Sequence, residues 1–189
     1  MEDFIHLHVH THYSILDGQS KVANLVKKAV GDGMRGMAIT DHGVMYGVKE
    51  LADCCAKVNK ERKAEGLEPF KPIFGCEMYV ARRTKEDKDK AMGDNSGYHL
   101  VVLAKNYKGY KNLIKLVSRA WVDGYYYKPR TDRADLERYH EGLIVCSACI
   151  AGEVPRKILD GDLEGAREAA QWYLSLIHIS EPTRLGMIS

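Results

Sequence analysis

Two histidines, His8 and His10, lie at the end of an apolar run near the start of the chain. On an extended segment, residues at positions i and i+2 project to the same side, so these two imidazoles face the same way. Neutral imidazole nitrogens are strong ligands for borderline divalent metals. A small polar turn follows the pair and is closed by Asp17 and Gly18, which allows a carboxylate to return toward the histidines. We interpret these residues as half of a metal site.

A second polar cluster follows the apolar segment 37–39 and consists of Thr40, Asp41, His42 and Gly43. In α/β folds, ligands and catalytic groups collect at the carboxyl ends of strands. We therefore expect His42 to be a further metal ligand and Asp41 to orient it or bind beside it. An aspartate that only caps a turn at the surface is the alternative.

Three more candidates come from later apolar segments: Glu77, His99 and Cys149. A carboxylate inside an apolar strand is costly to bury unless it is paired or bound to a cation, whereas an exposed Glu77 would need no partner. A lone cysteine such as Cys149 is usually core filler, but beside the other candidates it becomes a thiolate ligand. The full set of expected metal ligands is His8, His10, Asp17, His42, Glu77, His99 and Cys149.

This mixed set of nitrogen, oxygen and sulfur ligands is larger than one four-coordinate ion needs, so we expect two or three divalent metals. Zinc suits the set best, with manganese or iron as alternatives. Neighbouring metals activate water and stabilise both oxygens of a phosphoester displacement. The expected reaction is hydrolysis of a phosphate ester, and the expected catalytic residues are His8, His10, Asp41 and His42.

Residues 125–130, with the sequence YYYKPR, combine aromatic rings with two cations. Such a segment is able to stack a base and hold a phosphate, which makes Lys128 and Arg130 candidate substrate contacts. A tyrosine-rich turn that packs against the domain is the alternative.

Composition bounds the class of protein. A chain of 189 residues with 45% hydrophobic residues is long enough for one domain with a real core. The formal charge of +2 does not select a partner. An odd number of cysteines, five, and the lack of a signal peptide or a long apolar run predict a reducing, cytoplasmic location without membrane contact.

Apolar segments rich in β-branched residues alternate with amphipathic ones, which predicts an α/β fold with a largely parallel sheet. Residues 82–97 form a charged loop without apolar periodicity. The expected strands are residues 4–10, 36–40, 72–80, 99–104 and 143–146. The first expected helix is capped by Ser20 and ends at Gly31 or Gly33, and the other expected helices are residues 45–65, 107–121, 154–159 and 163–173.

The last stretch, residues 174–189, breaks the preceding helical period. Its sequence LSLIHISEPTR resembles the translation of a transposon-type sequencing adapter. We interpret it as a non-native tail after a domain that covers residues 1–173.

Six ordered motifs carry a family resemblance over residues 1–173. They are HLHVHTHYSILDG, ITDHG, FGCEMYV, HLVVLAKN, YYYKPR and SACIAGEVPR. Together they resemble the polymerase and histidinol phosphatase (PHP) domain, in the form found at the N-terminus of bacterial replicative DNA polymerases. The resemblance implies an irregular (β/α)7-like barrel, here truncated at its C-terminal end, with metals bound at the strand ends.

The resemblance places the metal ligands at the seven positions already named. It also implies a late Asp-x-His pair beyond Tyr173, which residues 174–189 do not match. The implied activity is 3′–5′ proofreading exonuclease, with DNA 3′ ends and the other replicative polymerase subunits as partners, while the fragment alone would not synthesise DNA. Two alternatives stay open: a non-catalytic brace that docks a separate proofreading subunit, and a stand-alone phosphatase of the histidinol-phosphatase type.

Overall fold

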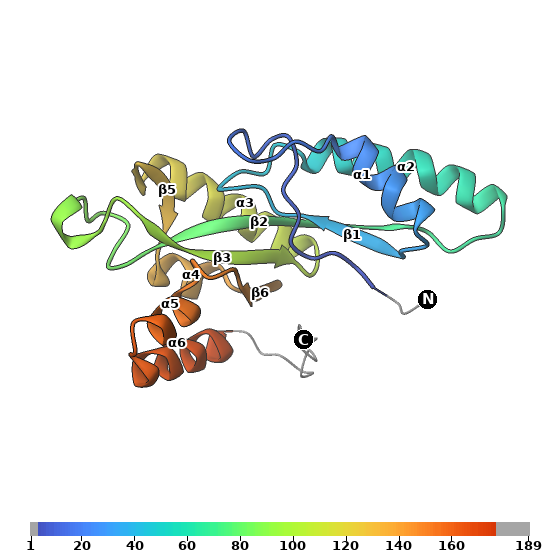
Figure 1. The fold of residues 1–189 in the computed structure, drawn as a ribbon. Helices are drawn as coiled ribbons and strands as arrows, with labels where there is room; N and C mark the ends of the chain where they lie inside the picture. Colours follow the sequence, from blue (N-terminus) through green and yellow to red (C-terminus); the bar gives the residue numbers. More distant parts are fainter. Residues whose placement is uncertain (1–3, 177–189) are drawn as a thin grey trace.

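A computed structural model of the chain describes residues 4–176 (Figure 1). The described elements, in chain order, are α1 (Val22–Gly31), β1 (Gly36–Ile39), α2 (Val48–Ala64), β2 (Lys71–Ala81), a 3-10 helix η1 (Lys90–Met92), β3 (Gly97–Ala104), α3 (Tyr107–Val122), β4 (Tyr125–Tyr126), β5 (Lys128–Thr131), α4 (Arg133–Tyr139), β6 (Leu143–Ser147), α5 (Glu153–Leu159) and α6 (Leu163–Leu176). None of the helices within this range is both long and apolar enough to cross a membrane.

The α/β class is confirmed, and β2 is the central strand of an irregular sheet. The path of paired strands is β4-β5-β2-β3-β6, and β1 pairs with the first part of β2. β1 and β5 run parallel to β2, but β3 runs antiparallel to both β2 and β6. The prediction of a largely parallel sheet is therefore wrong. A parallel pair needs a long crossover, usually a helix, whereas the segment between β2 and β3 is the predicted charged loop, which lets the chain turn straight back.

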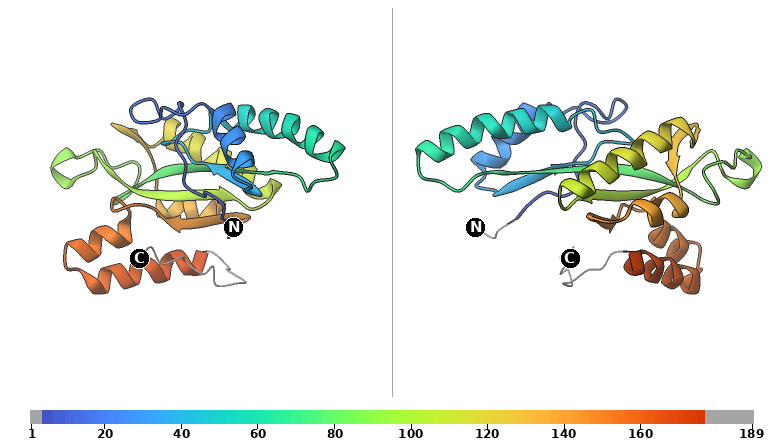
Figure 2. Two further views of the ribbon diagram at one scale, coloured as in Figure 1. Left: turned by 45° about the vertical axis from the view of Figure 1, so that its right-hand side comes forward. Right: turned by 180° about the vertical axis from the view of Figure 1, so that it is seen from behind.

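Helices cover the sheet on several sides. α1 and α2 lie above β1 in Figure 1, α5 and α6 lie below the sheet, and α3 crosses it in the view from behind (Figure 2). Cys76 and Met78 of β2 pack with Leu113 and Leu116 of α3 in one apolar core. A second core joins α1, α2 and β1. Because side chains alternate along a strand, Glu77 projects to the opposite side of β2 from the first core.

The N-terminal segment, residues 4–10, is extended but is not a regular strand, which corrects the prediction. Its backbone is tied beside β1 by hydrogen bonds from Ala38 N to His6 O (2.8 Å) and from Thr40 N to Val9 O (2.8 Å). Between these two hydrogen bonds the N-terminal segment advances by three residues, from His6 to Val9, while its partner advances by two, from Ala38 to Thr40. This mismatch is that of a β-bulge, and it prevents a regular ladder.

Two further features were not foreseen. Residues 125–131, predicted only as a turn, form the β4–β5 hairpin, and α4 follows it. α6 continues to Leu176, so the first three residues of the predicted tail are helical. The rest of that tail, residues 177–189, lies outside the described residues.

Candidate metal centre

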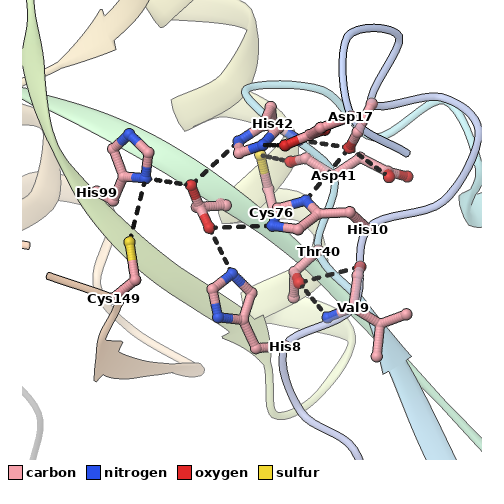
Figure 3. Close-up of polar contacts among 12 residues, drawn as sticks. His8, Val9, His10, Asp17, Thr40, Asp41, His42, Cys76, His99 and Cys149 are labelled. Carbon is pink, nitrogen blue, oxygen red and sulfur yellow. Dashed lines mark hydrogen bonds and ion pairs between the residues drawn. The ribbon is translucent and has the colours of Figure 1, made fainter. Parts of the chain in front are cut away.

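The carboxylate of Glu77 lies at the centre of four imidazoles, although only 1% of this residue is exposed (Figure 3). Its Oε2 contacts His8 Nε2 directly and lies 3.3 Å from His10 Nε2. Its Oε1 lies 2.5 Å from His99 Nδ1 and 3.1 Å from His42 Nδ1. Five of the seven predicted ligands therefore converge on one point.

The chain beyond β1 holds His42 next to Glu77. The two residues form a parallel bridge, and Glu77 N donates to Asp41 O (3.0 Å) while Gly43 N donates to Glu77 O (2.8 Å). The offset between partners is the same as in the β1–β2 ladder, so His42 lies just past the carboxyl end of β1. This is the position that the sequence predicted for it.

Asp41 points away from Glu77 and into the N-terminal loop. Its Oδ1 accepts hydrogen bonds from Thr11 N (2.6 Å) and Ser14 Oγ (2.8 Å), and its Oδ2 accepts one from Thr11 Oγ1 (2.9 Å). Ser14 Oγ in turn accepts from His42 N (3.2 Å). Asp41 is buried, and its carboxylate fixes the loop that follows His10.

Asp17 and Cys149 lie at the margins of the cluster. Asp17 Oδ2 is 2.8 Å from His42 Nε2, and Cys149 Sγ is 3.8 Å from His99 Nδ1. Both residues are exposed. All seven predicted ligands thus belong to one contiguous constellation.

Contacts within the cluster shift the pKa values of Glu77, His42 and Asp17 in favour of their charged forms. Burial of Glu77 raises the pKa of its carboxyl, but the contacts with the four imidazoles outweigh this and hold the pKa well below its ordinary value. The pKa of His42 is raised by its contact with Glu77, against the opposing effect of burial, and Asp17 raises it further. The pKa of Asp17 is lowered, chiefly by His42.

Two buried atoms of the cluster have the geometry of metal ligands rather than of hydrogen-bond partners. His42 Nδ1 and Glu77 Oε1 are buried without a properly aligned hydrogen bond, although they lie only 3.1 Å apart. Unpaired buried polar atoms are costly, and a bound cation would satisfy both. The ligand atoms fall into two groups, each within 4.8 Å: His8, His10 and Glu77, and His42, Glu77 and His99.

Tyr79 is a neighbour of the site that sequence reasoning missed. Its ring centroid lies 6.2 Å from that of His42 and 5.1 Å from that of His99. Burial raises the pKa of its phenol to about 12. The alternation that places Glu77 on this face of β2 also places Tyr79 there, so strand periodicity was the available signal.

The two predicted substrate contacts, Lys128 and Arg130, lie in different environments. Lys128 Nζ lies 5.3 Å from the centroid of the Tyr79 ring, beside the cluster. Arg130 is fully buried, and its guanidinium donates to the carbonyls of Gly124, Asp94 and Lys85 at 2.8 to 3.1 Å. The prediction that Arg130 contacts substrate is wrong, because no part of this residue is exposed.

The family model described as the PHP domain matches residues 6–181. The chain belongs to the PHP domain family.

Three curated relatives of this PHP domain are each named DNA polymerase III subunit alpha. The protein from Borreliella burgdorferi is 45% identical over 170 residues, which are 90% of this chain and 14% of the relative. The protein from Treponema pallidum is 43% identical over 176 residues, or 93% of this chain and 14% of the relative. The protein from Aquifex aeolicus is 41% identical over 177 residues, or 90% of this chain and 14% of the relative. The PHP domain chain therefore spans about one seventh of the length of these relatives.

Proposed function

We propose that this PHP domain is a metal-dependent phosphoesterase within a replicative DNA polymerase subunit, and that it removes nucleotides from DNA 3′ ends. The observation that carries the proposal is the buried Glu77 carboxylate among four imidazoles, in which Glu77 Oε1 and His42 Nδ1 lack an aligned hydrogen bond. The names of the curated relatives support the polymerase context.

Two or three divalent cations would be held here. Glu77 belongs to both candidate ligand groups, so it would help to hold more than one cation. Asp17 and Cys149 would complete the coordination at the margins, next to His42 and His99. Nitrogen-rich ligands with carboxylate and thiolate favour zinc, with manganese or iron as alternatives. When bound, such cations activate water and stabilise charge on phosphate oxygens.

The chain's own residues would orient the reaction. His8, His10 and His42 are three of the four imidazoles around Glu77, and they are the proposed catalytic ligands. Asp41 is a positioning residue, because it holds Thr11 and Ser14 rather than facing the cluster. Lys128 offers a positive charge beside Tyr79 for a phosphate of the substrate.

The alternatives lack comparable support. A non-catalytic brace does not need seven ligand residues in one constellation, yet all seven are present. A stand-alone phosphatase is disfavoured because the curated relatives carry the polymerase name and are about seven times longer than the matched region. DNA 3′ ends and the other replicative polymerase subunits are proposed as partners because they belong to the proposed polymerase context.

The decisive experiment uses the full-length protein with His8→Ala and His10→Ala combined. We expect loss of metal-dependent nucleotide release from a 3′-labelled single-stranded oligonucleotide, while DNA synthesis continues. His140→Ala is the matched control, because His140 is in contact with the backbone of Glu137 in α4 and not with the cluster. Unchanged nucleotide release in the double variant would exclude this site. A wild-type protein with tight metal binding but no release would favour the brace.

A further inference from the structure

An exposed group of aromatic rings lies at the end of α3 and in the β4–β5 hairpin. We call Trp121, Tyr125 and Tyr127 the aromatic platform. The rings of Trp121 and Tyr125 stack with centroids 5.5 Å apart and an interplanar angle of 18°. These three side chains are 42%, 49% and 59% exposed, respectively. Large aromatic surfaces that remain open to solvent often mark binding sites.

The hairpin turn contains backbone strain at the same place. Tyr127 has a φ of +60°, and no other non-glycine residue in the described part of the chain has a positive φ. It lies between the paired residues Tyr126 and Lys128. Holding a bulky residue in the left-handed region costs on the order of 1 kcal/mol or more, and such strain clusters at functional sites. Glycine or asparagine would form this turn with less strain, so the tyrosine ring itself is the feature that needs explanation.

The aromatic platform directly adjoins the metal centre. Trp121 Nε1 donates to Gly43 O at 2.8 Å, and Gly43 follows His42 in the chain. The hairpin packs on this glycine, because a Cβ there would lie 2.7 Å from Pro129 Cγ. Lys128, which precedes Pro129 in the hairpin, lies over Tyr79, whose ring borders His42 and His99. Aromatic rings, an ammonium group and imidazoles therefore follow one another across this surface.

We infer that the aromatic platform is a binding subsite for single-stranded nucleic acid, with bases stacked on Trp121 and Tyr125 and a phosphate held by Lys128. This inference rests on the proposed function, for which it supplies the path of the strand that leads to the metal centre. Single-strand binding sites combine aromatic faces for the bases with cations for the backbone, and stacking tolerates any base. The aromatic platform supplies the rings and the neighbouring Lys128 supplies the cation, beside the candidate metal ligands.

The test measures binding without catalysis. The 189-residue chain, kept in a metal chelator, is titrated into a fluorescein-labelled oligothymidylate while fluorescence anisotropy is recorded. Tyr125→Ala should weaken binding about tenfold through loss of stacking. Lys128→Ala should weaken binding and reduce its salt dependence by about one phosphate contact. Tyr125 is a better probe than Trp121, which also holds the Gly43 carbonyl.

Two matched control variants each remove an exposed tyrosine or an exposed lysine that lies away from the aromatic platform. Tyr107→Ala deletes a 72% exposed tyrosine at the opposite end of α3, about 20 Å from Trp121 along the helix. Lys63→Ala deletes an exposed lysine in the last turn of α2. Both controls should bind like the unmodified chain.

Three outcomes would overturn the inference. The first is equal binding by Tyr125→Ala and Tyr107→Ala. The second is equal affinity for an abasic oligomer of the same length, which has phosphates but no bases to stack. The third is no binding by the unmodified chain, which would rule out a nucleic-acid subsite on the platform. The binding test contains no metal and therefore does not depend on catalysis. If the chain binds the oligonucleotide but the separate nuclease assay shows no activity, only the proposed function is contradicted.

Discussion

Glu77 belongs to both candidate ligand groups, and each of its oxygens lies close to two imidazoles. A buried carboxylate in this position attracts divalent cations that the imidazoles alone would hold less tightly, since it supplies a negative charge at low dielectric. The charge of Glu77, rather than only its shape, should therefore govern metal affinity.

Glu77→Gln tests this directly because the amide keeps the size of the side chain and removes its charge. We expect the affinity for zinc to fall by about 100-fold or more, since even partners outside the coordination sphere contribute about 10- to 100-fold. Isothermal titration calorimetry with zinc would measure it. Glu50→Gln is the control, because Glu50 contacts Tyr13 and His12 outside the cluster. Equal zinc affinity in the two variants would contradict a central role for Glu77.

Asp41→Asn tests the separation between positioning and ligation. The buried carboxylate accepts three hydrogen bonds, and the amide cannot accept all of them. We expect the free energy of unfolding to fall by about 2 to 3 kcal/mol, measured by urea denaturation without metal. Asp53→Asn, which removes an exposed ion pair with Lys49, should change it by less than about 1 kcal/mol. If Asp41→Asn abolished zinc binding without destabilising the fold, Asp41 would be a ligand.

Residue types and spacing were enough to predict which ligands meet, but not every role. Alternate imidazoles and a histidine after a strand predicted that these side chains meet, whereas Asp41 proved to hold Thr11 and Ser14. Arg130 shows the limit, because a cation beside aromatic rings has the same sequence pattern whether it faces solvent or three buried carbonyls. Only the packing of the segments around it distinguishes the two cases.

At the scale of elements, the positions of helices were predicted better than the directions of strands. Amphipathic periodicity identified α1 and α3 close to their observed bounds. Strand direction depends on what connects the strands, and the charged loop between β2 and β3 gave no apolar signal of its own. The structure shows why this loop nevertheless has a defined shape: Arg130 donates to the carbonyls of Lys85 and Asp94 within it, and Arg83 pairs with Asp94.

Arg130→Lys tests whether one side chain fixes this loop to β5. Lysine keeps the positive charge but lacks the planar fork that reaches three carbonyls at once. We expect faster proteolytic cleavage within residues 82–97 and a loss of about 2 to 4 kcal/mol in the free energy of unfolding, because charge-assisted hydrogen bonds are lost in a buried site. Arg167→Lys, at an exposed position of α6, is the control. Equal cleavage rates in the two variants would show that the loop is held by other contacts.

At the scale of the whole molecule, the candidate ligands come from segments that are far apart in the chain. They lie in the N-terminal segment, after β1, in β2, in β3 and after β6. A cation that joins them would tie the irregular N-terminal segment to the sheet, in addition to the hydrogen bonds that His6 and Val9 make with Ala38 and Thr40. Metal binding should therefore be coupled to the stability of the whole fold.

This coupling predicts a metal-dependent melting temperature. Zinc at 100 times its dissociation constant adds about 2.7 kcal/mol to stability. For a chain of this size we expect a rise of about 5 to 10 °C, measured by circular dichroism before and after chelation. The rise should shrink as the pH falls, because a protonated imidazole cannot bind metal and the contact with Glu77 raises the pKa of His42. Glu77→Gln should show little of the rise at any pH. An equal rise in this variant would mean that zinc stabilises the protein from another site, since the carboxylate of Glu77 would then be dispensable.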